Sequence, residues 1–237
     1  IDGFQSDLLH EINAHPFTKK SKAGYVSRTY TREKVRREMD IIESEYGRRS
    51  PELYVSGYPI DDLVLREDFL NLVESEINKL VQCTKDNKSA IIVGAPRKDN
   101  NHIKNSVFVI ENGNIVSIKD KYELPNTGVF DEQRIFKQGS LEDCVIIKGI
   151  KFGLPICEDI WEKTVLEKLS KSGAEIIIAI NASPFTVSKN EERENIAILR
   201  VNETKLPIVY LNRTGGQDEL IFDGSSFALN HDGKKFY

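Results

Sequence analysis

Cysteine and histidine are scarce in this sequence, and their spacing argues against disulfides and zinc. Its 237 residues include three cysteines, Cys83, Cys144 and Cys157, and four histidines. An odd number of distant cysteines is typical of a reducing cytoplasm. No Cys-x-x-Cys pair occurs and the histidines are scattered, so the ligand spacing of a structural zinc site is absent. We therefore expect a cytoplasmic protein that binds no metal.

The sequence also lacks a long apolar run and an excess of basic residues. Its apolar stretches fall far short of the roughly 20 residues that cross a bilayer, and its start, Ile1-Asp2-Gly3-Phe4, shows no signal-peptide pattern. The formal net charge of -4 gives no broad basic surface. Membrane and nucleic-acid partners are therefore not expected. A composition of 39% hydrophobic and 30% charged residues is that of an ordinary soluble protein.

From about residue 89 onward, short apolar runs alternate with polar turns, which predicts a succession of strands. The first run is 90–94. Three pairs of later runs predict hairpins: 106–110 with 114–118, 144–147 with 151–156, and 220–222 with 226–230. In the first pair the connection Glu111-Asn112-Gly113 contains an Asn-Gly step, a strong hairpin signal. In the second pair, Lys148-Gly149 forms the turn.

Helical spacing or dense charge predicts four helices, at 31–48, 68–86, 161–172 and 190–205. Ala174 to Ile180 is an almost continuous β-branched run, as expected for a strand buried on both faces, and 207–211 is a further strand. Strands mixed with helices in this order predict a layered α/β domain. Residues 1–50 contain no convincing buried strand, and we interpret them as a helical extension or an arm.

Cys157 is the candidate nucleophile. It follows the apolar segment 152–156 and precedes Glu158-Asp159-Ile160-Trp161, which opens a helix. A cysteine at a strand-to-helix turn can present its sulfur near helix-terminal N–H groups, as the nucleophile elbow of other α/β enzymes does. The competing interpretation is a buried structural cysteine, which is commoner for an isolated cysteine.

Electrostatics add a requirement. A free thiol has a pKa of about 8.5 and is mostly protonated at neutral pH. Glu158 and Asp159 would raise that pKa further if they pointed toward the sulfur. A reactive Cys157 therefore needs a base and a nearby cation. No histidine lies near it in the sequence, so a Cys–His pair is not inferred.

Several sequence blocks resemble the nitrilase superfamily, and specifically the glutaminase domain of NAD synthetases. The nucleophile block is Gly153–Trp161. The others, found in the family's order, are 51–53 with 56–59 and 61–63, then 121–126 with 128–132, and finally 181–185 with 215–220 and 222–224. A single block would be a weak match, but ordered blocks over residues 51–233 form a specific one.

The resemblance implies a role for each matching residue. Glu52 would be the general base, Lys121 the cation that stabilises the oxyanion, and Cys157 the nucleophile. Glu132 resembles a second acid, which positions the lysine or the leaving ammonia. The positions around the glutamine pocket would be Thr127, Phe130, Glu158, Ser183, Pro184 and Phe185. Trp161 is interpreted as a core or interface residue.

The resemblance also implies a fold, a reaction and partners. The fold would be an αββα sandwich. The reaction would be hydrolysis of glutamine to glutamate and ammonia, which a synthetase domain uses to amidate nicotinic acid adenine dinucleotide. No cofactor is implied for this half, because ATP and magnesium belong to the synthetase half. A homo-oligomer is expected by analogy with the family.

The sequence departs from the family pattern at three places. Residues 1–50 are an atypical N-terminal segment before a nitrilase-like domain at 51–237, because 45–50 lacks the apolar strand that normally leads to the base. Thr127 stands where the family usually has tyrosine. The chain ends before the last strands expected of the fold, which predicts a C-terminal truncation, and it contains no phosphate loop of a synthetase.

Two alternative functions remain open from the sequence. One is a free-standing nitrilase-type amidase that acts on another small amide. The other is a catalytically inactive fragment that serves as a binding or assembly module, an interpretation prompted by residues 1–50. A competent thiol at Cys157 would argue against the second.

Overall fold

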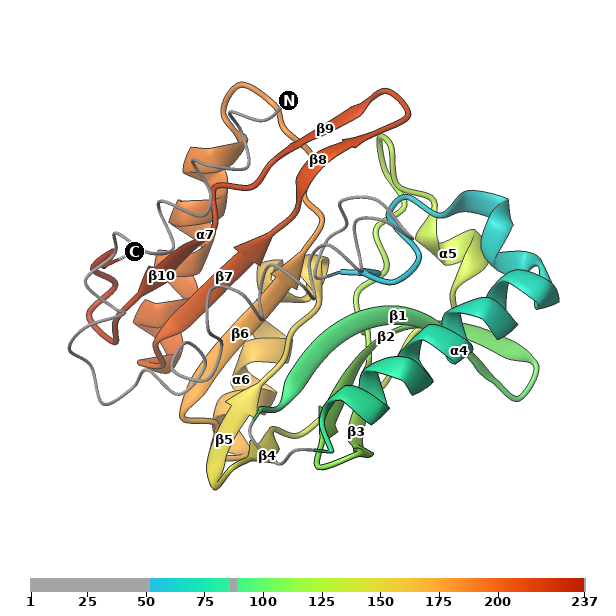
Figure 1. The fold of residues 1–237 in the computed structure, drawn as a ribbon. Helices are drawn as coiled ribbons and strands as arrows, with labels where there is room; N and C mark the ends of the chain where they lie inside the picture. The colour runs from blue at the N-terminus through green and yellow to red at the C-terminus, as the bar shows by residue number, and fades with distance from the viewer. Residues whose placement is uncertain (1–51, 86–88, 237) are drawn as a thin grey trace, which may run out of the picture. The chain divides into compact units, whose positions relative to one another are not determined.

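Two β-sheets form the centre of the described structure, a computed structural model that covers residues 52–85 and 89–236. One sheet has three strands in the order β1-β2-β3, and the other has five in the order β10-β7-β6-β5-β4 (Figure 1). The predicted helix at 31–48 and the proposed arm at 1–50 lie outside the described residues. No helix in the described ranges is long and apolar enough to cross a membrane.

The three-stranded sheet is an antiparallel meander. Its strands are β1 (Ile91–Asp99), β2 (His102–Glu111) and β3 (Asn114–Asp120). The turn between β2 and β3 is the predicted Asn112-Gly113 pair. Both residues have positive φ, 54° and 75°, as a two-residue turn of type I′ requires. The first predicted hairpin is therefore confirmed, with Glu111 opposite Asn114.

The five-stranded sheet has a parallel centre and antiparallel edges. Its strands are β4 (Val145–Ile147), β5 (Ile150–Gly153), β6 (Ile176–Asn181), β7 (Ile208–Asn212) and β10 (Phe227–Leu229). Strands β5, β6 and β7 run parallel, whereas β4 and β10 are antiparallel to their neighbours. The second predicted hairpin is confirmed as β4–β5, and the β-branched run is the central strand β6.

Helices cover the outer faces of both sheets. On the three-stranded side lies α4 (Glu67–Cys83); on the other side lie α6 (Lys163–Lys171) and α7 (Lys189–Thr204) (Figure 1). These correspond to three of the predicted helices. Three shorter helices complete the described structure: η1 (Asp61–Leu65), α5 (Glu132–Ile135) and η2 (Cys157–Trp161).

Side-chain alternation explains how the layers stack. On β2, Val107 and Val109 face the second sheet, while Phe108 and Ile110 pack beneath α4. On β6, every second side chain likewise points into the space between the two sheets, and the others pack against α6 and α7. A strand buried on both faces needs apolar residues in both registers. The layers are helix, sheet, sheet, helix, which confirms the expected αββα sandwich.

The third predicted hairpin is wrong. Residues 220–222 belong to β9 (Leu220–Asp223), which pairs with β8 (Thr214–Gln217). The segment 226–230 supplies β10, which pairs with β7. Two successive left-handed residues, Gly224 and Ser225, redirect the chain between β9 and β10. The prediction failed because Thr214 to Gln217 lacks the apolar alternation of a strand.

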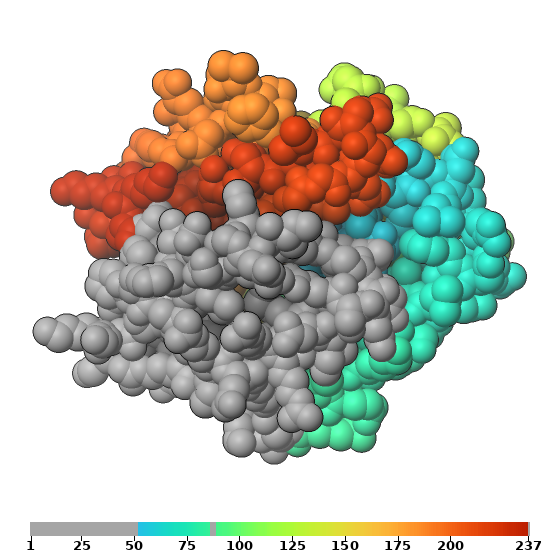
Figure 2. Space-filling view, turned by 45° about the horizontal axis from the view of Figure 1, so that its top comes forward, coloured from blue at the N-terminus to red at the C-terminus, as the bar shows by residue number. Residues whose placement is uncertain are grey.

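The β8–β9 hairpin reaches the start of the described chain. Arg213, just before β8, donates from Nη1 to the backbone oxygen of Tyr58 at 2.6 Å, and its guanidinium lies 4.6 Å from the centre of the Phe222 ring. In the space-filling view, the orange-red atoms of the hairpin lie against the cyan atoms that begin the described chain (Figure 2). The first and last parts of the domain therefore meet.

At Gly153, the last residue of β5, neighbouring side chains leave little room for a Cβ atom. A Cβ there would lie 2.5 Å from Ile177 Cδ1 and 3.1 Å from Leu169 Cδ1. We predict that Gly153→Ala lowers the free energy of unfolding by about 1–3 kcal/mol, since overpacking displaces neighbours. Urea denaturation measures the change. Gly216→Ala, where the nearest atom is at 3.6 Å, should stay within about 0.5 kcal/mol of wild type; equal effects at both glycines would contradict the packing argument.

Candidate active site

Three segments that are distant in the sequence bring charged side chains together between the sheets. Glu52 begins the described chain, Lys121 directly follows β3, and Glu132 opens α5. The Lys121 ammonium donates to Glu52 Oε1 at 2.7 Å and forms an ion pair with Glu132 Oε2 at 2.8 Å. All three residues are buried, with exposed fractions of 3% or less.

Uncharged hydrogen-bond donors also bind the carboxylates of Glu52 and Glu132. The side-chain amide of Asn105, on β2, donates to Glu52 Oε1 and to Glu132 Oε1, each at 3.1 Å. The backbone N–H of Ala182 donates to Glu52 Oε2 at 3.0 Å. Each carboxylate thus receives hydrogen bonds as well as the ammonium contact, which is the condition for stable buried charge.

The charges of this cluster keep Lys121 protonated. Burial alone lowers the pKa of a lysine, but the carboxylates of Glu132 and Glu52 more than offset that effect, and the pKa of Lys121 lies well above its ordinary value. Burial also raises the pKa of Glu132 to about 7, although Lys121 acts in the opposite direction. The cluster therefore holds a permanent cation next to a carboxyl group that titrates near neutrality.

Cys157 lies at the predicted strand-to-helix turn. It is the first residue of η2 and has a φ of 49°, a left-handed conformation that costs a non-glycine residue about 1 kcal/mol or more. The preceding residue, Ile156, still pairs with Ile180 of β6. The sharp change of backbone direction after the sheet resembles a nucleophile elbow.

The surroundings of Cys157 favour the neutral thiol at rest. Burial and the negative charge of Glu52 raise the pKa of Cys157 well above its ordinary value, and the Lys121 ammonium only partly opposes this. The Glu52 carboxylate is close enough to the thiol for its charge to raise that pKa. A thiol in this setting becomes a nucleophile by transferring its proton to that carboxylate.

The two acids after Cys157 have different surroundings. Glu158 is half-buried, and burial raises its pKa against the lowering effects of Lys121 and Lys189. Asp159 is buried, and its carboxylate accepts backbone N–H bonds from Tyr122, Glu123 and Ile156. No pattern in the sequence indicates these backbone contacts.

The other sequence-predicted pocket residues form two groups. Phe130 is half-buried, with its ring centre 6.0 Å from that of Tyr58, and Thr127 is exposed in the same loop. Ser183 is buried at the end of β6, Pro184 is half-buried and Phe185 is exposed. The structure therefore places these residues in two loops that follow the Lys121 and β6 segments.

The loop with Ser183 and Pro184 is held by side chains that the sequence analysis did not identify. The fully buried Arg193, on α7, donates to the backbone oxygens of Ser183 and Pro184 at 2.8 and 2.9 Å, and to Ser183 Oγ at 3.1 Å. Arg193 also forms an ion pair with Asp223 at 2.8 Å. Asn212 Oδ1 accepts from the Ser183 N–H at 2.9 Å.

Two residues at the charged cluster were also missed. Asn105 lies in a predicted apolar strand, where a single polar residue carries no functional signal. Tyr58 belongs to a resembling block, but that block implied no role for it. Its ring centre lies 5.9 Å from the Lys121 nitrogen, and burial together with the charge of Glu132 raises its pKa well above the ordinary value. Trp161, in contrast, packs against the α6–α7 core as expected, with Lys189 over its ring.

No group of three His, Cys, Asp or Glu side chains that could hold a metal ion occurs within residues 52–85 and 89–236. The site consists instead of a thiol, two carboxylates and an ammonium. These groups can carry out nucleophilic attack, proton transfer and oxyanion stabilisation.

The fold is that of a hydrolase of carbon–nitrogen bonds. The carbon–nitrogen hydrolase family matches residues 50–236, and this chain belongs to that family. Glutamine-dependent NAD(+) synthetases are among its relatives. That of Rhodobacter capsulatus is 38% identical over 77% of this chain, and that of Acinetobacter baylyi is 39% identical over 78%. The chain spans about a third of the length of each, 33% and 34%.

Solved structures agree on the fold. The glutamine-dependent NAD+ synthetase from Acinetobacter baumannii superposes with a TM-score of 0.75 at 33% identity, covering 86% of this chain and 39% of that one. An amidase from a Nesterenkonia species superposes with a TM-score of 0.68 at 18% identity, covering 84% of this chain and 81% of its own. The second comparison supports the sandwich fold alone.

The left-handed backbone of Cys157 gives a first prediction for the site. At a residue with negative φ, replacing alanine by glycine costs about 0.5–1 kcal/mol of stability. At Cys157 we expect the reverse order: Cys157→Gly should be as stable as Cys157→Ala or more stable, by up to about 1 kcal/mol, because glycine adopts positive φ without strain. Urea unfolding of both variants tests this. Ala197→Gly, in α7, is the control and should show the ordinary loss.

The raised pKa of Glu132 gives a second prediction. The folded protein binds this proton more tightly than the unfolded chain does, so the contribution to stability is complete below pH about 4.3 and is lost as the pH rises through about 7. Relative to Glu132→Gln, the wild type should lose about 2 kcal/mol of unfolding free energy between pH 5.5 and pH 8. Glu74→Gln, an exposed change on α4, should follow wild type. If the unfolding free energies of wild type and Glu132→Gln change in parallel with pH, the raised pKa of Glu132 is refuted.

Proposed function

We propose that this domain hydrolyses glutamine to glutamate and ammonia through Cys157, Glu52 and Lys121. The observation that carries the proposal is the buried contact between Lys121 and Glu52, with the Cys157 thiol close enough for the charges of both groups to act on it. This is the combination that a cysteine nucleophile without a histidine partner requires. Membership of the carbon–nitrogen hydrolase family and the synthetase relatives support the choice of an amide substrate.

In the proposed mechanism, Glu52 accepts the thiol proton as the sulfur attacks the side-chain amide carbon of glutamine. The oxyanion that develops is stabilised by the Lys121 ammonium and by the backbone N–H of Glu158. Glu52 then gives its proton to the leaving nitrogen, and ammonia departs from a thioester on Cys157. Water, activated by Glu52, hydrolyses the thioester and restores the thiol.

Glu132 would act on Lys121 rather than on the substrate. Its carboxylate gives the ammonium a second buried partner besides Glu52, so Lys121 keeps one position as charge moves during the reaction. The pocket for the rest of glutamine would include Thr127 and Phe130 from one loop and Ser183, Pro184 and Phe185 from the other. The half-buried carboxylate of Glu158 offers a partner for the substrate's ammonium group.

The synthetase relatives support a proposal for the use of the ammonia. We propose that it is used by the synthetase part of the same enzyme to amidate nicotinic acid adenine dinucleotide in an ATP- and magnesium-dependent reaction. ATP and magnesium would bind to that part, and the amidase site described above would need no cofactor. A homo-oligomer in the cytoplasm remains part of the same proposal.

Covalent trapping with 6-diazo-5-oxo-norleucine, a glutamine-like electrophile, tests the site. Peptide mass spectrometry should find one label, on Cys157, in the wild type. Glu52→Gln should slow labelling by at least about 100-fold, because the variant has no base for the thiol proton. The control variant Glu74→Gln changes an exposed carboxylate on α4, and its Cys157 should be labelled at the wild-type rate.

The chain supplies its own controls for specificity. Cys83 is exposed and Cys144 is half-buried, so a reagent that selects thiols by exposure alone would label Cys83 first. Label on Cys83 without label on Cys157, or labelling of Cys157 that is unchanged in Glu52→Gln, would reject the proposed mechanism. Hydrolysis of other small amides in preference to glutamine would retain the mechanism and reject the substrate.

A further inference from the structure

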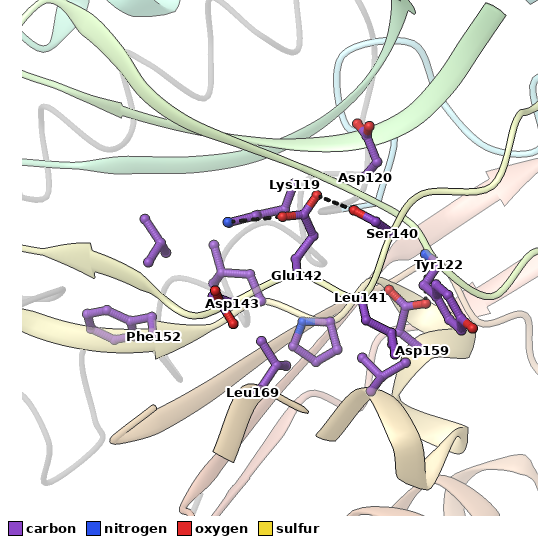
Figure 3. A pocket seen from close by; sticks show the side chains of 14 residues that line it. Lys119, Asp120, Tyr122, Ser140, Leu141, Glu142, Asp143, Phe152, Asp159 and Leu169 are labelled. Carbon is purple, nitrogen blue, oxygen red and sulfur yellow. Dashed lines mark hydrogen bonds and ion pairs between the residues drawn. The ribbon is translucent and has the colours of Figure 1, made fainter. Parts of the chain in front are cut away.

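Asp159 is a buried carboxylate for which the proposed mechanism has no use. It is 3% exposed and lies at one end of a cavity of about 20 Å³, which has room for roughly one water molecule. Figure 3 shows its side chain beside Tyr122 and Leu141. Leu154 and Pro155 line this cavity, whereas Glu52, Lys121 and Glu132 do not.

The hydrogen bonds of Asp159 differ from those of the other acids at this cavity. Glu142 pairs with Lys119 at 3.4 Å, Asp120 with Arg97 at 2.8 Å, and Asp143 with Lys168 at 2.6 Å. Asp159 instead accepts three backbone N–H groups. Its Oδ1 accepts from Tyr122 at 3.1 Å and from Glu123 at 2.7 Å, and its Oδ2 accepts from Ile156 at 3.0 Å.

These donors lie directly beside the two reacting groups. Tyr122 follows Lys121, and Ile156 precedes Cys157. Lys121 comes from the end of β3 in the three-stranded sheet, whereas Cys157 follows β5 in the five-stranded sheet. Within the described ranges no main-chain hydrogen bond joins residues 121–123 to residues 156–159. The Asp159 carboxylate is therefore a direct polar link between the backbone that carries the ammonium and the backbone that carries the sulfur.

We infer that Asp159 is a positioning residue, which sets the distance between the Lys121 ammonium and the Cys157 sulfur by binding the backbone of both segments. The inference rests on the proposed function, since that distance matters for the proposed chemistry. A carboxylate suits the task because its two oxygens offer about four acceptor sites and no donor. An asparagine has the same shape but one acceptor oxygen, and its NH₂ group would face a backbone N–H.

A positioning role has consequences that a purely structural one lacks. When the ammonium is correctly placed it lowers the pKa of the Cys157 thiol, against the effects of burial and of Glu52. If the backbone link loosens, the attraction between ammonium and thiolate weakens steeply with distance. The thiol should then ionise at higher pH, and the chemical step should slow more than substrate binding weakens.

The test uses the whole 237-residue chain with Asp159→Asn, and Asp143→Asn as the matched control. Asp143 lines the same cavity, but its side chain is 64% exposed and pairs only with Lys168. Three quantities are measured: the folded fraction by circular dichroism, kcat and KM for glutamine, and the rate of iodoacetamide alkylation of Cys157 from pH 6 upward through its midpoint. Peptide mass spectrometry separates Cys157 from Cys83 and Cys144.

For Asp159→Asn we expect a folded protein whose kcat falls at least tenfold while KM changes less than threefold. The midpoint of Cys157 alkylation should move to higher pH. Asp143→Asn should match wild type in all three quantities. If Asp159→Asn does not fold, Asp159→Ser, which leaves space for a water beside the three N–H groups, should show the same changes. A folded variant with wild-type kcat and alkylation midpoint, or a loss of activity equal to the unfolded fraction, would overturn the inference.

The same measurements separate this inference from the proposed function. A wild type that does not hydrolyse glutamine, together with a midpoint that still moves in Asp159→Asn, would reject the glutaminase function and keep the positioning role. An active wild type whose alkylation midpoint is unchanged in the variant would reject the positioning role alone.

Discussion

The buried ammonium of Lys121, held between the carboxylates of Glu52 and Glu132, is the interaction on which the site depends. Removing one partner of a buried ion pair leaves an uncompensated charge, which typically costs about 3–5 kcal/mol. Three distant segments are therefore tied to one another at this point. Asn105 from β2 and the N–H of Ala182 after β6 add hydrogen bonds from both sheets. The site is consequently a contact between the layers of the sandwich.

The same charges determine the state of the nucleophile. A carboxylate close enough to take the thiol proton also raises the pKa of that thiol, and the nearby ammonium only partly compensates. The raised pKa favours a neutral sulfur at rest, and in the proposed mechanism thiolate forms when the proton moves to Glu52. This arrangement differs from a cysteine paired with an imidazolium, where the thiolate is stable before substrate arrives. In the proposed mechanism, reactivity requires a substrate whose oxyanion the Lys121 ammonium can then stabilise.

Much of the fold could be predicted from local sequence, whereas the support of the site could not. The Asn112-Gly113 turn, the β-branched run of β6 and the helical spacing of α4 and α6 each express a preference of neighbouring residues. The β8–β9 pairing was missed because Gly215 and Gly216 carry no apolar alternation. The positions of Cys157, Lys121, Glu52 and Glu132 came from motif resemblance. Asn105 contacts residues 27 and 53 positions away in the sequence, and Arg193 contacts residues 9 to 30 positions away. Asp159 contacts residues up to 37 positions away. No local sequence pattern encodes such contacts.

The division of the site between the two sheets has a consequence for folding. The N–H of Ala182 reaches Glu52 across 130 residues of sequence, and closing so long a loop is among the slower steps of a folding reaction. A chain with only the β4–β7 sheet formed would contain the Cys157 turn but neither the base nor the ammonium. Its sulfur would behave as an ordinary thiol. The proposed nucleophile is thus a property of the completed tertiary structure, and a partly folded or nascent chain would carry only an ordinary thiol at this position.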